Sequence, residues 1–465
     1  MAQFPFITDG IIGDVPTNFF PAADPAKGVV LHGTPGLTQL CDLADCTEIR
    51  GMFPFNGYLY TVARRGGESV LWRVSSTGSY SEIGTITTSA SGPVWMTENQ
   101  TQLLIVDGVS GWTYTESSGG LAQITDASFP GASSASYQDG YGLFTQPSTN
   151  YWFFSAINDF RSFDALDIYS KEGKPDNVIS ILSNHREVWI FGTESIEVWY
   201  NAGGDNTSTS NPTFARNAGG LLEYGCGAAK SPASFDNSLA WLSEKGQLLR
   251  ATGYNAQIIS NDLWGEQVKD YTVLNNAIAF SYTDMEHEFY QITFPSDDVT
   301  WVFDAKTKLF HKKSSYKGSN EFGRHRANCY ALLNRKHYVG DYENGKIYEM
   351  SMDYLDDAGE EIRRVVYSPE MHSGMKRTFY PSVQIEFEPG VGLESGLDPQ
   401  AMLEYSNDGG KNWGSEIWRS VGKVGEYSER AIWHRLGSGY RRMYRLSVAD
   451  PVKWQVRGVH WWGGK

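Results

Sequence analysis

The sequence predicts an all-β protein whose main body is a β-propeller. Three observations lead to this fold class: short segments alternate with a period of two, turn dipeptides separate them, and units of several such segments recur along the chain. The units are spaced by roughly 30–50 residues, as expected for propeller blades. Because a ring of small sheets buries faces that one sheet alone would expose, we expect about seven blades, with six possible.

The segment 175–201 shows this pattern most clearly. Val188 and Ile190 alternate with Trp189 and Phe191, so that both faces of the predicted strand carry large apolar groups. A strand that is apolar on both faces belongs inside packed sheets and not at a wet edge. This unit is therefore expected to lie between neighbouring blades.

Six other segments follow the same plan, and several carry dipeptides that favour tight hairpins because both residues tolerate positive φ. The segments are 55–86, 100–124, 137–156, 237–260, 287–315 and 329–351, with Asn56-Gly57, Asp107-Gly108 and Asp139-Gly140 as turn signals. Helical periodicity is rare in the sequence, and short helices are expected only near 158–166 and 261–270.

The chain divides into three parts by composition. Residues 1–36 carry five prolines and are expected to form an extended N-terminal arm. Residues 37–360 contain the repeated units and form the predicted propeller body. Residues 361–465 are predicted to form an antiparallel β-sandwich-like region appended to it.

The pattern of the C-terminal part differs from that of the repeats. Val383, Ile385 and Phe387 alternate with polar residues, which is typical of an antiparallel strand with one buried face. Residues 441–448 alternate in the same way.

The charge of the chain argues against sequence-specific nucleic-acid binding. The formal net charge is −15, and an acidic surface repels phosphate. The charge is uneven: residues 361–465 hold 15 Lys and Arg against 12 Asp and Glu, or +3, which leaves −18 for the remainder.

The cysteines and the apolar segments indicate a protein that folds in a reducing compartment. Cys41, Cys46, Cys226 and Cys329 have no metal-ligand spacing and are expected to be free thiols. The N-terminal residues lack the basic region of a secretory signal, and no apolar run approaches the ~20 residues of a membrane span. We therefore expect a soluble molecule.

One short motif stands out, in residues 406–413. Ser406, Asp408, Gly410 and Trp413 match the Asp-box, a stapled β-hairpin turn in which the aspartate accepts backbone N–H bonds and the tryptophan packs beneath. Asp-boxes recur in sialidases, so glycoside hydrolysis has to be considered. A single copy without an identifiable acid pair favours a structural hairpin.

No catalytic, cofactor-binding or metal-binding residues are predicted. The nine histidines form no HExxH or His-x-His pair, and the acidic run 353–361 lacks calcium-loop spacing. The sequence contains no P-loop, no GxSxG and no GxGxxG after a strand. Since propeller active sites are assembled from distant loops, this alone does not exclude an enzyme.

The sequence resembles the tail-hub, or tail-nozzle, proteins of short-tailed bacteriophages, also known as packaged DNA stabilisation proteins. Residues 32–37 (HGTPGL) and 49–62 (IRGMFPFNGYLYTV) resemble the start of these proteins, and the similarity continues in order through 100–108, 162–177, 185–201 and 225–246. In 185–201 the signature residues of this strand pair are His185, Arg186, Glu187, Trp189, Gly192, Glu197, Trp199 and Tyr200.

The resemblance implies a structural, non-enzymatic virion protein with a propeller-like body. It is expected to be made in the host cytoplasm and to form a hexameric hub in the tail, below the portal and adaptor. Its implied partners are further copies of itself, the head-to-tail adaptor and portal complex, tail fibre or tailspike proteins and tail-tip proteins. Such a hub retains packaged DNA and lets double-stranded DNA pass without sequence preference.

The charge agrees with a conduit. Basic walls would gain affinity at every phosphate through counterion release, whereas an acidic wall forfeits that gain. We therefore expect acidic residues of 1–350 to line the lumen. Two alternatives stay open: a glycan-binding or glycan-cleaving virion propeller, and an assembly scaffold or chaperone.

Overall fold

The computed structural model describes residues 15–24, 28–117, 120–208, 210–317, 321–374, 376–393, 396 and 398–464. The chain forms two compact units. One comprises the described residues of Met1–Thr38, Val299–His325 and Met350–Lys465, and the other comprises those of Gln39–Asp298 and Arg326–Glu349. The domain limits expected at residues 36 and 360 remain predictions.

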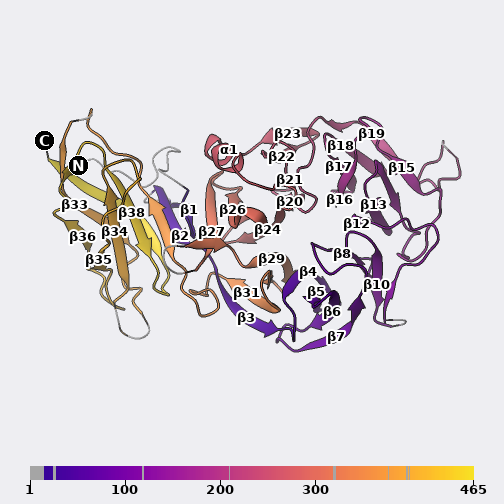
Figure 1. Cartoon of the computed structure of the whole chain (residues 1–465), viewed down its shortest axis with the longest axis horizontal. Coiled ribbons are helices and arrows are strands. Elements are labelled where there is room, and N and C mark those ends of the chain that lie inside the picture. Colours follow the sequence, from indigo (N-terminus) through magenta and orange to yellow (C-terminus); the bar gives the residue numbers. More distant parts are fainter. Residues whose placement is uncertain are drawn as a thin grey trace. The chain divides into compact units, whose positions relative to one another are not determined.

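The described chain from Gly36 to Ser351 contains seven sheets of four or five strands, which agrees with the expected number of blades. Figure 1 shows the strands of the unit formed by Gln39–Asp298 and Arg326–Glu349 arranged around a common centre. The first five follow the sequence: β4–β7 (Glu48–Phe55, Tyr58–Arg65, Glu68–Val74, Tyr80–Ile86), β8–β11 (Trp95–Glu98, Gln102–Val106, Gly111–Thr115, Gly120–Gln123), β12–β15 (Ser134–Gln138, Tyr141–Thr145, Tyr151–Phe154, Ile168–Ser170), β16–β19 (Val178–Asn184, Glu187–Gly192, Ile196–Asn201, Phe214–Leu222) and β20–β23 (Ala233–Phe235, Ser238–Leu242, Leu248–Thr252, Asn255–Ile258).

The sixth and seventh sheets differ in how they are completed. The sixth has five strands in sequence order: β24 (Ile278–Asp284), β25 (His287–Phe294), β26 (Val299–Asp304), β27 (Phe310–Tyr316) and β28 (Phe322–Arg324), with the short 3-10 helix η1 (Pro295–Asp297) before β26. The seventh has the order β29 (Ala327–Leu333), β30 (Lys336–Asp341), β31 (Lys346–Ser351) and β3 (Gly36–Asp42). Strand β3 precedes the first sheet in sequence. The ring is therefore completed by segments from the beginning and the end of the propeller sequence.

Apolar side chains from neighbouring sheets pack together, which explains why the strands are apolar on both faces. One cluster joins Tyr60 and Leu71 of β5 and β6 to Leu103 and Trp112 of the next sheet. Similar clusters connect the following sheets, and one joins the seventh sheet to the first. Each sheet therefore depends on its neighbours for burial.

Two of the three tight turns predicted from the dipeptides are confirmed, whereas Asp107-Gly108 lies in a longer turn in which only Gly108 has a positive φ, of 90°. Asn56 and Gly57 have φ of 47° and 80° between β4 and β5, and Asp139 and Gly140 have φ of 50° and 95° between β12 and β13. Such positive φ pairs match the right-handed twist of the flanking strands.

One of the two expected helices is present. Helix α1 (Asp262–Val268) begins after Asn261, whose side chain accepts the Trp264 N–H at 2.9 Å. The helix expected near 158–166 was wrong: Asn158 has φ of 56°, and the N–H of Phe160 donates to the Gln102 side chain. Side-chain acceptors take the N–H groups that would begin a helix, so turns form instead.

The C-terminal region forms two antiparallel sheets, as the sequence predicts. The first has the order β1 (Phe19–Asp24), β2 (Gly28–Gly33), β39 (Gln455–Gly464), β33 (Thr378–Phe387) and β36 (Ala431–His434), with β37 (Ser438–Gly439) also pairing with β33; the second has the order β32 (Arg364–Tyr367), β38 (Met443–Val448), β34 (Gln400–Ser406) and β35 (Ile417–Ser420). Their buried faces share one core that includes Val383, Ile385, Leu403 and Leu446.

Part of the expected N-terminal arm is incorporated in this region. Strands β1 and β2 pair as a hairpin, and Leu31 pairs with Val456 of β39. The buried Asn18 side chain donates to the carbonyl oxygens of Ser314 and Arg363 at 2.8 and 2.9 Å. Residues 1–14 and 25–27 of the predicted arm lie outside the described residues.

Candidate functional site

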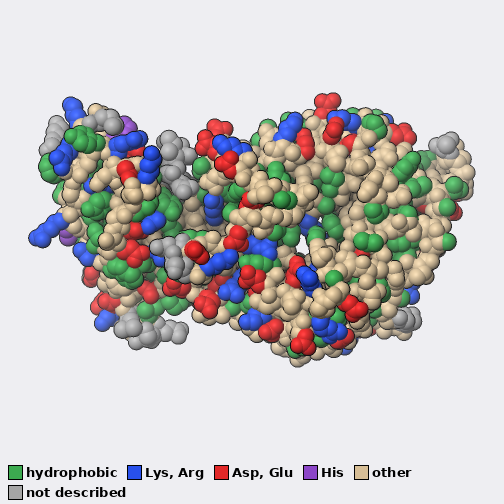
Figure 2. All heavy atoms as spheres, in the orientation of Figure 1, with side chains coloured by type: hydrophobic (Ala, Val, Ile, Leu, Met, Phe, Trp, Pro, Cys, Tyr) green, Lys and Arg blue, Asp and Glu red, His purple; other side chains and the backbone are tan. Residues whose placement is uncertain are grey.

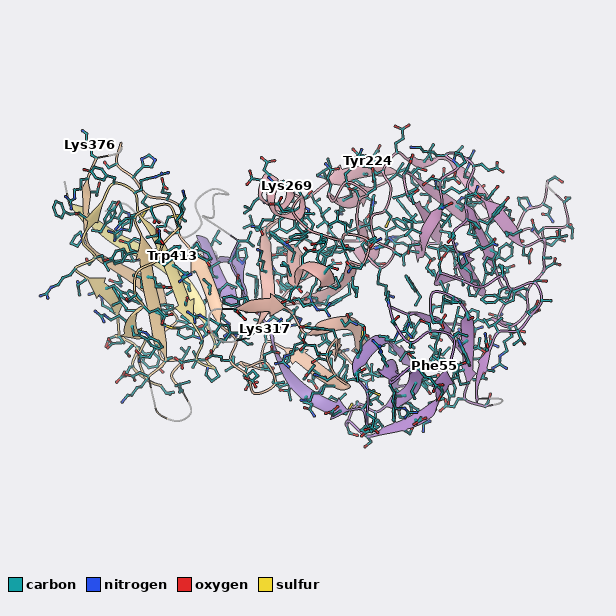
Figure 3. All side chains as sticks on the ribbon, in the orientation of Figure 1. Phe55, Tyr224, Lys269, Lys317, Lys376 and Trp413 are labelled. Carbon is teal, nitrogen blue, oxygen red and sulfur yellow. The ribbon has the colours of Figure 1, made fainter. Side chains whose placement is uncertain are left out.

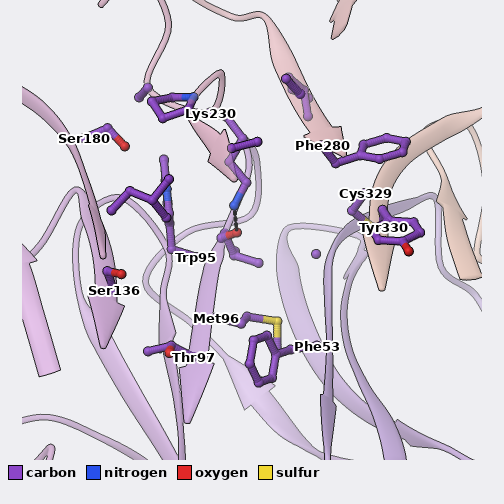
Figure 4. A pocket seen from close by; sticks show the side chains of 18 of the residues that line it. Phe53, Trp95, Met96, Thr97, Ser136, Ser180, Lys230, Phe280, Cys329 and Tyr330 are labelled. Carbon is purple, nitrogen blue, oxygen red and sulfur yellow. Dashed lines mark hydrogen bonds between the residues drawn. The ribbon is translucent and has the colours of Figure 1, made fainter. Parts of the chain in front are cut away.

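A cavity lies at the centre of the propeller, and one strand of each sheet lines it. The lining strands are β4, β8, β12, β16, β20, β24 and β29, and the cavity volume is ≈ 480 Å³. The lining is mostly small or apolar, with hydroxyl groups such as those of Ser136 and Ser180 facing the space in Figure 4. Figure 2 shows this face of the molecule, with acidic and basic side chains interspersed over the blades.

Lys230 supplies the charged group of this cavity. Its ammonium donates to the Val94 carbonyl oxygen at 2.8 Å and lies 4.7 Å from the centre of the Trp95 ring (Figure 4). Burial lowers the pKa of Lys230 to about 8, and it raises the pKa of Cys329 and of Tyr330 to about 12 each. Near neutral pH the lysine is therefore cationic while the thiol and the phenol are uncharged.

The cavity is too small to serve as a DNA passage. A sphere of ≈ 480 Å³ is about 10 Å across, whereas the major groove of a duplex alone is about 12 Å wide. The expected DNA conduit is therefore not the centre of a single propeller.

Three polar members of the signature strand pair, His185, Arg186 and Glu187, lie at the turn between β16 and β17. His185 and Arg186 have φ of 51° and 63°, and the Arg186 carbonyl accepts from Gln138 at 2.8 Å. His185 contacts Asn237 at 3.1 Å, and the Glu187 carboxylate accepts the Tyr254 hydroxyl. These contacts reach the sheets on both sides and tie three consecutive blades together.

Of the aromatic residues in the signature strand pair, two are buried and one is exposed. Trp189 and Trp199 are buried, the first beside Phe191 in the core shared with β20–β23 and the second against Trp152 at 5.3 Å between ring centres. Tyr200 is 44% exposed. Trp189 and Trp199 therefore hold the blades together from opposite faces of one sheet.

Glu197 is a fully buried carboxylate on β18. It accepts the N–H of Gly173 and the indole N–H of Trp199, and it lies 3.5 Å from the guanidinium of Arg216. These hydrogen bonds and the nearby guanidinium stabilise the ionised carboxylate, which would otherwise be costly to bury inside the blade.

An ion pair with both partners buried lies in the same blade, and sequence reasoning missed it. The Lys171 ammonium contacts the Asp176 carboxylate and the Ser195 hydroxyl, and the carboxylate accepts the N–H of Glu194 at 2.7 Å. Burial would raise the pKa of Asp176, but the bonds to Lys171, Glu194 and Ser195 lower it overall. The pair anchors the loop before β16 to the turn between β17 and β18.

Gly192 is required by the same network. A Cβ atom at this position would lie 2.2 Å from an Asp176 carboxylate oxygen and 2.8 Å from the Ser195 carbonyl oxygen. The segment 162–177 contains the Lys and Asp of this network, but nothing in their spacing marks them as a buried pair. Their packing arises only when the blade folds.

The Asp-box residues lie in the other unit, at the end of β34. The Ser406 hydroxyl contacts Asp408 at 2.7 Å and accepts the Gly410 N–H at 3.0 Å, and Asp408 accepts the Asn412 N–H at 3.0 Å. The bonds that Asp408 accepts from the Asn412 N–H and from the Ser406 hydroxyl lower the pKa of its carboxyl group. Trp413, labelled in Figure 3, stacks with Arg445 at 4.8 Å.

Other types of site find little support in the described part of the chain. Its residues include no group of three or more His, Cys, Asp or Glu arranged to hold a metal ion. The four cysteines are free thiols. Among the helices that the structure describes, none is long and apolar enough to cross a membrane.

Comparison with known protein families shows to which family the chain belongs. Residues 10–355 match the family described as "Bacteriophage P22 Gp10, beta-propeller", and residues 363–461 match "Bacteriophage P22 Gp10, beta-sandwich". The chain belongs to the P22 Gp10 family. It is a phage stabilisation or tail hub protein of the P22 Gp10 type, and the family is one of phage virion proteins. The resemblance to packaged DNA stabilisation proteins and the all-β fold of propeller and sandwich are thus confirmed.

Comparison with individual proteins adds little to the family match. No curated protein matches the sequence. Similar solved structures include the extracellular domain of a hybrid two-component system from B. thetaiotaomicron (11% identity, TM-score 0.46, 83% of this chain and 47% of that one), virginiamycin B lyase from Staphylococcus aureus (8%, 0.46, 68% and 99%) and the WD40 domain of coronin from Toxoplasma gondii (9%, 0.42, 72% and 87%). The chain spans about half the length of the first of these, and no functional conclusion follows from such distant likenesses.

Proposed function

We propose that this P22 Gp10-type protein acts as a hexameric tail hub that retains packaged DNA and surrounds the path of its ejection. The observation that carries the proposal is the family match, which extends over both the propeller and the sandwich. The size of the axial cavity supports a lumen between copies, because one propeller leaves only ≈ 480 Å³ at its centre. Its partners are then the adaptor and portal complex on one side and tail fibre or tailspike and tail-tip proteins on the other.

The oligomer is tested by electron microscopy of tail complexes and by mass measurement of the purified protein. Six chains of 51.9 kDa give a ring of about 311 kDa. Six copies around the tail axis in mature particles are the expected result. Absence of the protein from mature particles would instead indicate an assembly scaffold and contradict the proposal.

Charge supports a lumen with little affinity for DNA. The −18 outside residues 361–465 provides many carboxylates, and repulsion from them acts over about 8 Å at physiological salt. We expect acidic residues of 1–350 to face the DNA path. A neutral or basic wall in a structure of the assembled ring would refute this part.

The proposed role requires no catalysis. In the described residues the Asp-box aspartate is held within its own turn, so its carboxylate serves local structure. Purified protein is expected to leave host lipopolysaccharide uncleaved and unbound. Cleavage or saturable binding of the glycan would favour the alternative of a glycan-active virion propeller.

A further inference from the structure

We propose that the axial cavity of the propeller binds a small oxyanion, such as inorganic phosphate or a carboxylate, through the Lys230 ammonium. The inference concerns the interior of one propeller and does not depend on how copies assemble. Lys230 reaches the cavity from the segment before β20, and its backbone carbonyl accepts the Ala279 N–H at 2.9 Å. This bond holds the backbone at Lys230 against β24 of the next sheet.

The ammonium has no acidic counterpart among the described residues that line the cavity. The lining contains no Asp or Glu, and the contacts of the Lys230 ammonium are the Val94 carbonyl oxygen at 2.8 Å and the face of the Trp95 ring at 4.7 Å. An ammonium has three donors, and these two contacts leave at least one N–H to bind a ligand.

Electrostatics favour an anion at this position. The two other titratable side chains that line the cavity, Cys329 and Tyr330, have pKa values raised to about 12 by burial, so they carry no charge near neutral pH. Burial has already lowered the pKa of Lys230 to about 8, which reflects the cost of an isolated charge. An anion beside the ammonium would offset this cost.

The rest of the lining suits a small polar ligand. Hydroxyl groups come from Ser136, Ser180 and Thr97, and Ser136 Oγ already accepts the Ser183 N–H at 2.9 Å, which leaves its own proton to donate. A volume of ≈ 480 Å³ lies within the usual range of small-molecule sites. The same volume excludes the phosphates of a DNA duplex, so the ligand is a free anion.

Calorimetric titration of the full chain with sodium phosphate and with sodium acetate tests the proposal, with sodium chloride at equal ionic strength as the reference. The wild-type protein should bind one of the two anions saturably, and the anion that binds identifies the class. Lys230→Met should weaken binding roughly tenfold or more, since a hydrogen bond to a charged group is lost. Lys269→Met, which removes an exposed lysine labelled in Figure 3, should bind as the wild type does.

Three results would overturn the proposal: no saturable binding by the wild type at millimolar concentrations, equal binding by Lys230→Met, or equal losses in both lysine variants. Circular dichroism shows whether Lys230→Met folds. If it does not fold, an experimental structure of the wild-type chain in phosphate or acetate tests whether an anion occupies the cavity. Density beside Lys230 Nζ supports the site, and an empty cavity refutes it.

Discussion

Arg50 on β4 shows how single side chains hold irregular segments in place. Its guanidinium is buried and donates to the carbonyl oxygens of Ser89, Ser91 and Gly92 at 2.6–2.8 Å and to the Ser69 hydroxyl at 2.7 Å. A planar group with five fixed donors fits such a set of acceptors, and an ammonium does not.

We therefore expect Arg50→Lys to lower the free energy of unfolding by about 2–4 kcal/mol, because the buried side chain loses several of its hydrogen bonds to the segment 89–92. Urea denaturation measures the change. Arg65→Lys is the matched control, since Arg65 forms an exposed pair with Glu82 and should change stability by less than about 1 kcal/mol. Equal effects at the two positions would contradict this role of Arg50.

The buried pair of Lys171 and Asp176 predicts a pH dependence. The pKa of Asp176 is lowered in the folded state, so its ionised form stabilises the fold above the unfolded value of about 3.9, and this stabilisation is lost as pH falls through the lower folded-state pKa. Asp176→Asn leaves Lys171 buried without its counterion and should cost roughly 3–5 kcal/mol near neutral pH.

Denaturation of both proteins between about pH 7 and about pH 3 tests this sign, and the stability difference between wild type and Asp176→Asn should narrow as the solution becomes more acidic. A difference that stays constant or widens would show that the Asp176 carboxylate does not stabilise the fold in its ionised form.

At the scale of elements, β17 could be predicted from the sequence but its surroundings could not. The alternation of Val188 and Ile190 with Trp189 and Phe191 predicted a strand buried on both faces, and all four side chains are buried. The ion pair behind Gly192 could not be inferred, because its partners lie in a loop and a turn whose contacts no periodicity encodes. The helix wrongly predicted near 158–166 has a similar explanation, because hydrogen bonds from backbone N–H groups to nearby side chains favour turns over a helix there.

Trp189→Ala should destabilise the propeller by roughly 3–5 kcal/mol, because a large ring is removed from the core between two blades. Tyr200→Ala on the next strand is the control, since Tyr200 is 44% exposed and should have a much smaller effect. Thermal melting compares the two variants. Normal melting of Trp189→Ala would mean that this core contributes little to the ring.

At the scale of the whole molecule, the repeat predicted the number of sheets but not how the ring closes. Degenerate repeats indicated about seven blades, yet nothing in residues 1–36 predicted a hairpin in the sandwich sheet, since prolines there favoured an extended arm. Pairing between strands that lie so far apart in the sequence depends on tertiary packing, which cannot be inferred from local sequence periodicity. The axial cavity was likewise unpredictable, because Lys230 has no motif around it.

Because β3 completes the seventh sheet, a substitution that disrupts β3 is expected to destabilise the other strands of this sheet. Cys41 on β3 is buried in the cluster that joins the seventh sheet to the first, so Cys41→Asp places a charge there and should cost roughly 3 kcal/mol or more. Hydrogen exchange should become faster in β29 and β30. Thr38→Asp, at an exposed position of the same strand, should leave exchange unchanged; equal protection in both variants would mean that β3 is dispensable.

The pairing of β2 with β39 and of β31 with β3 also has a consequence during translation. Strands β2 and β3 need partners that are synthesised much later than they are, at Gln455–Gly464 and Lys346–Ser351. Blades in the middle of the sequence can begin to form on the nascent chain, but neither unit is completed by vectorial growth from its start. A polypeptide that ends before these partners are made would thus leave β2 and β3 with unpaired edges, to which strands of other chains can pair.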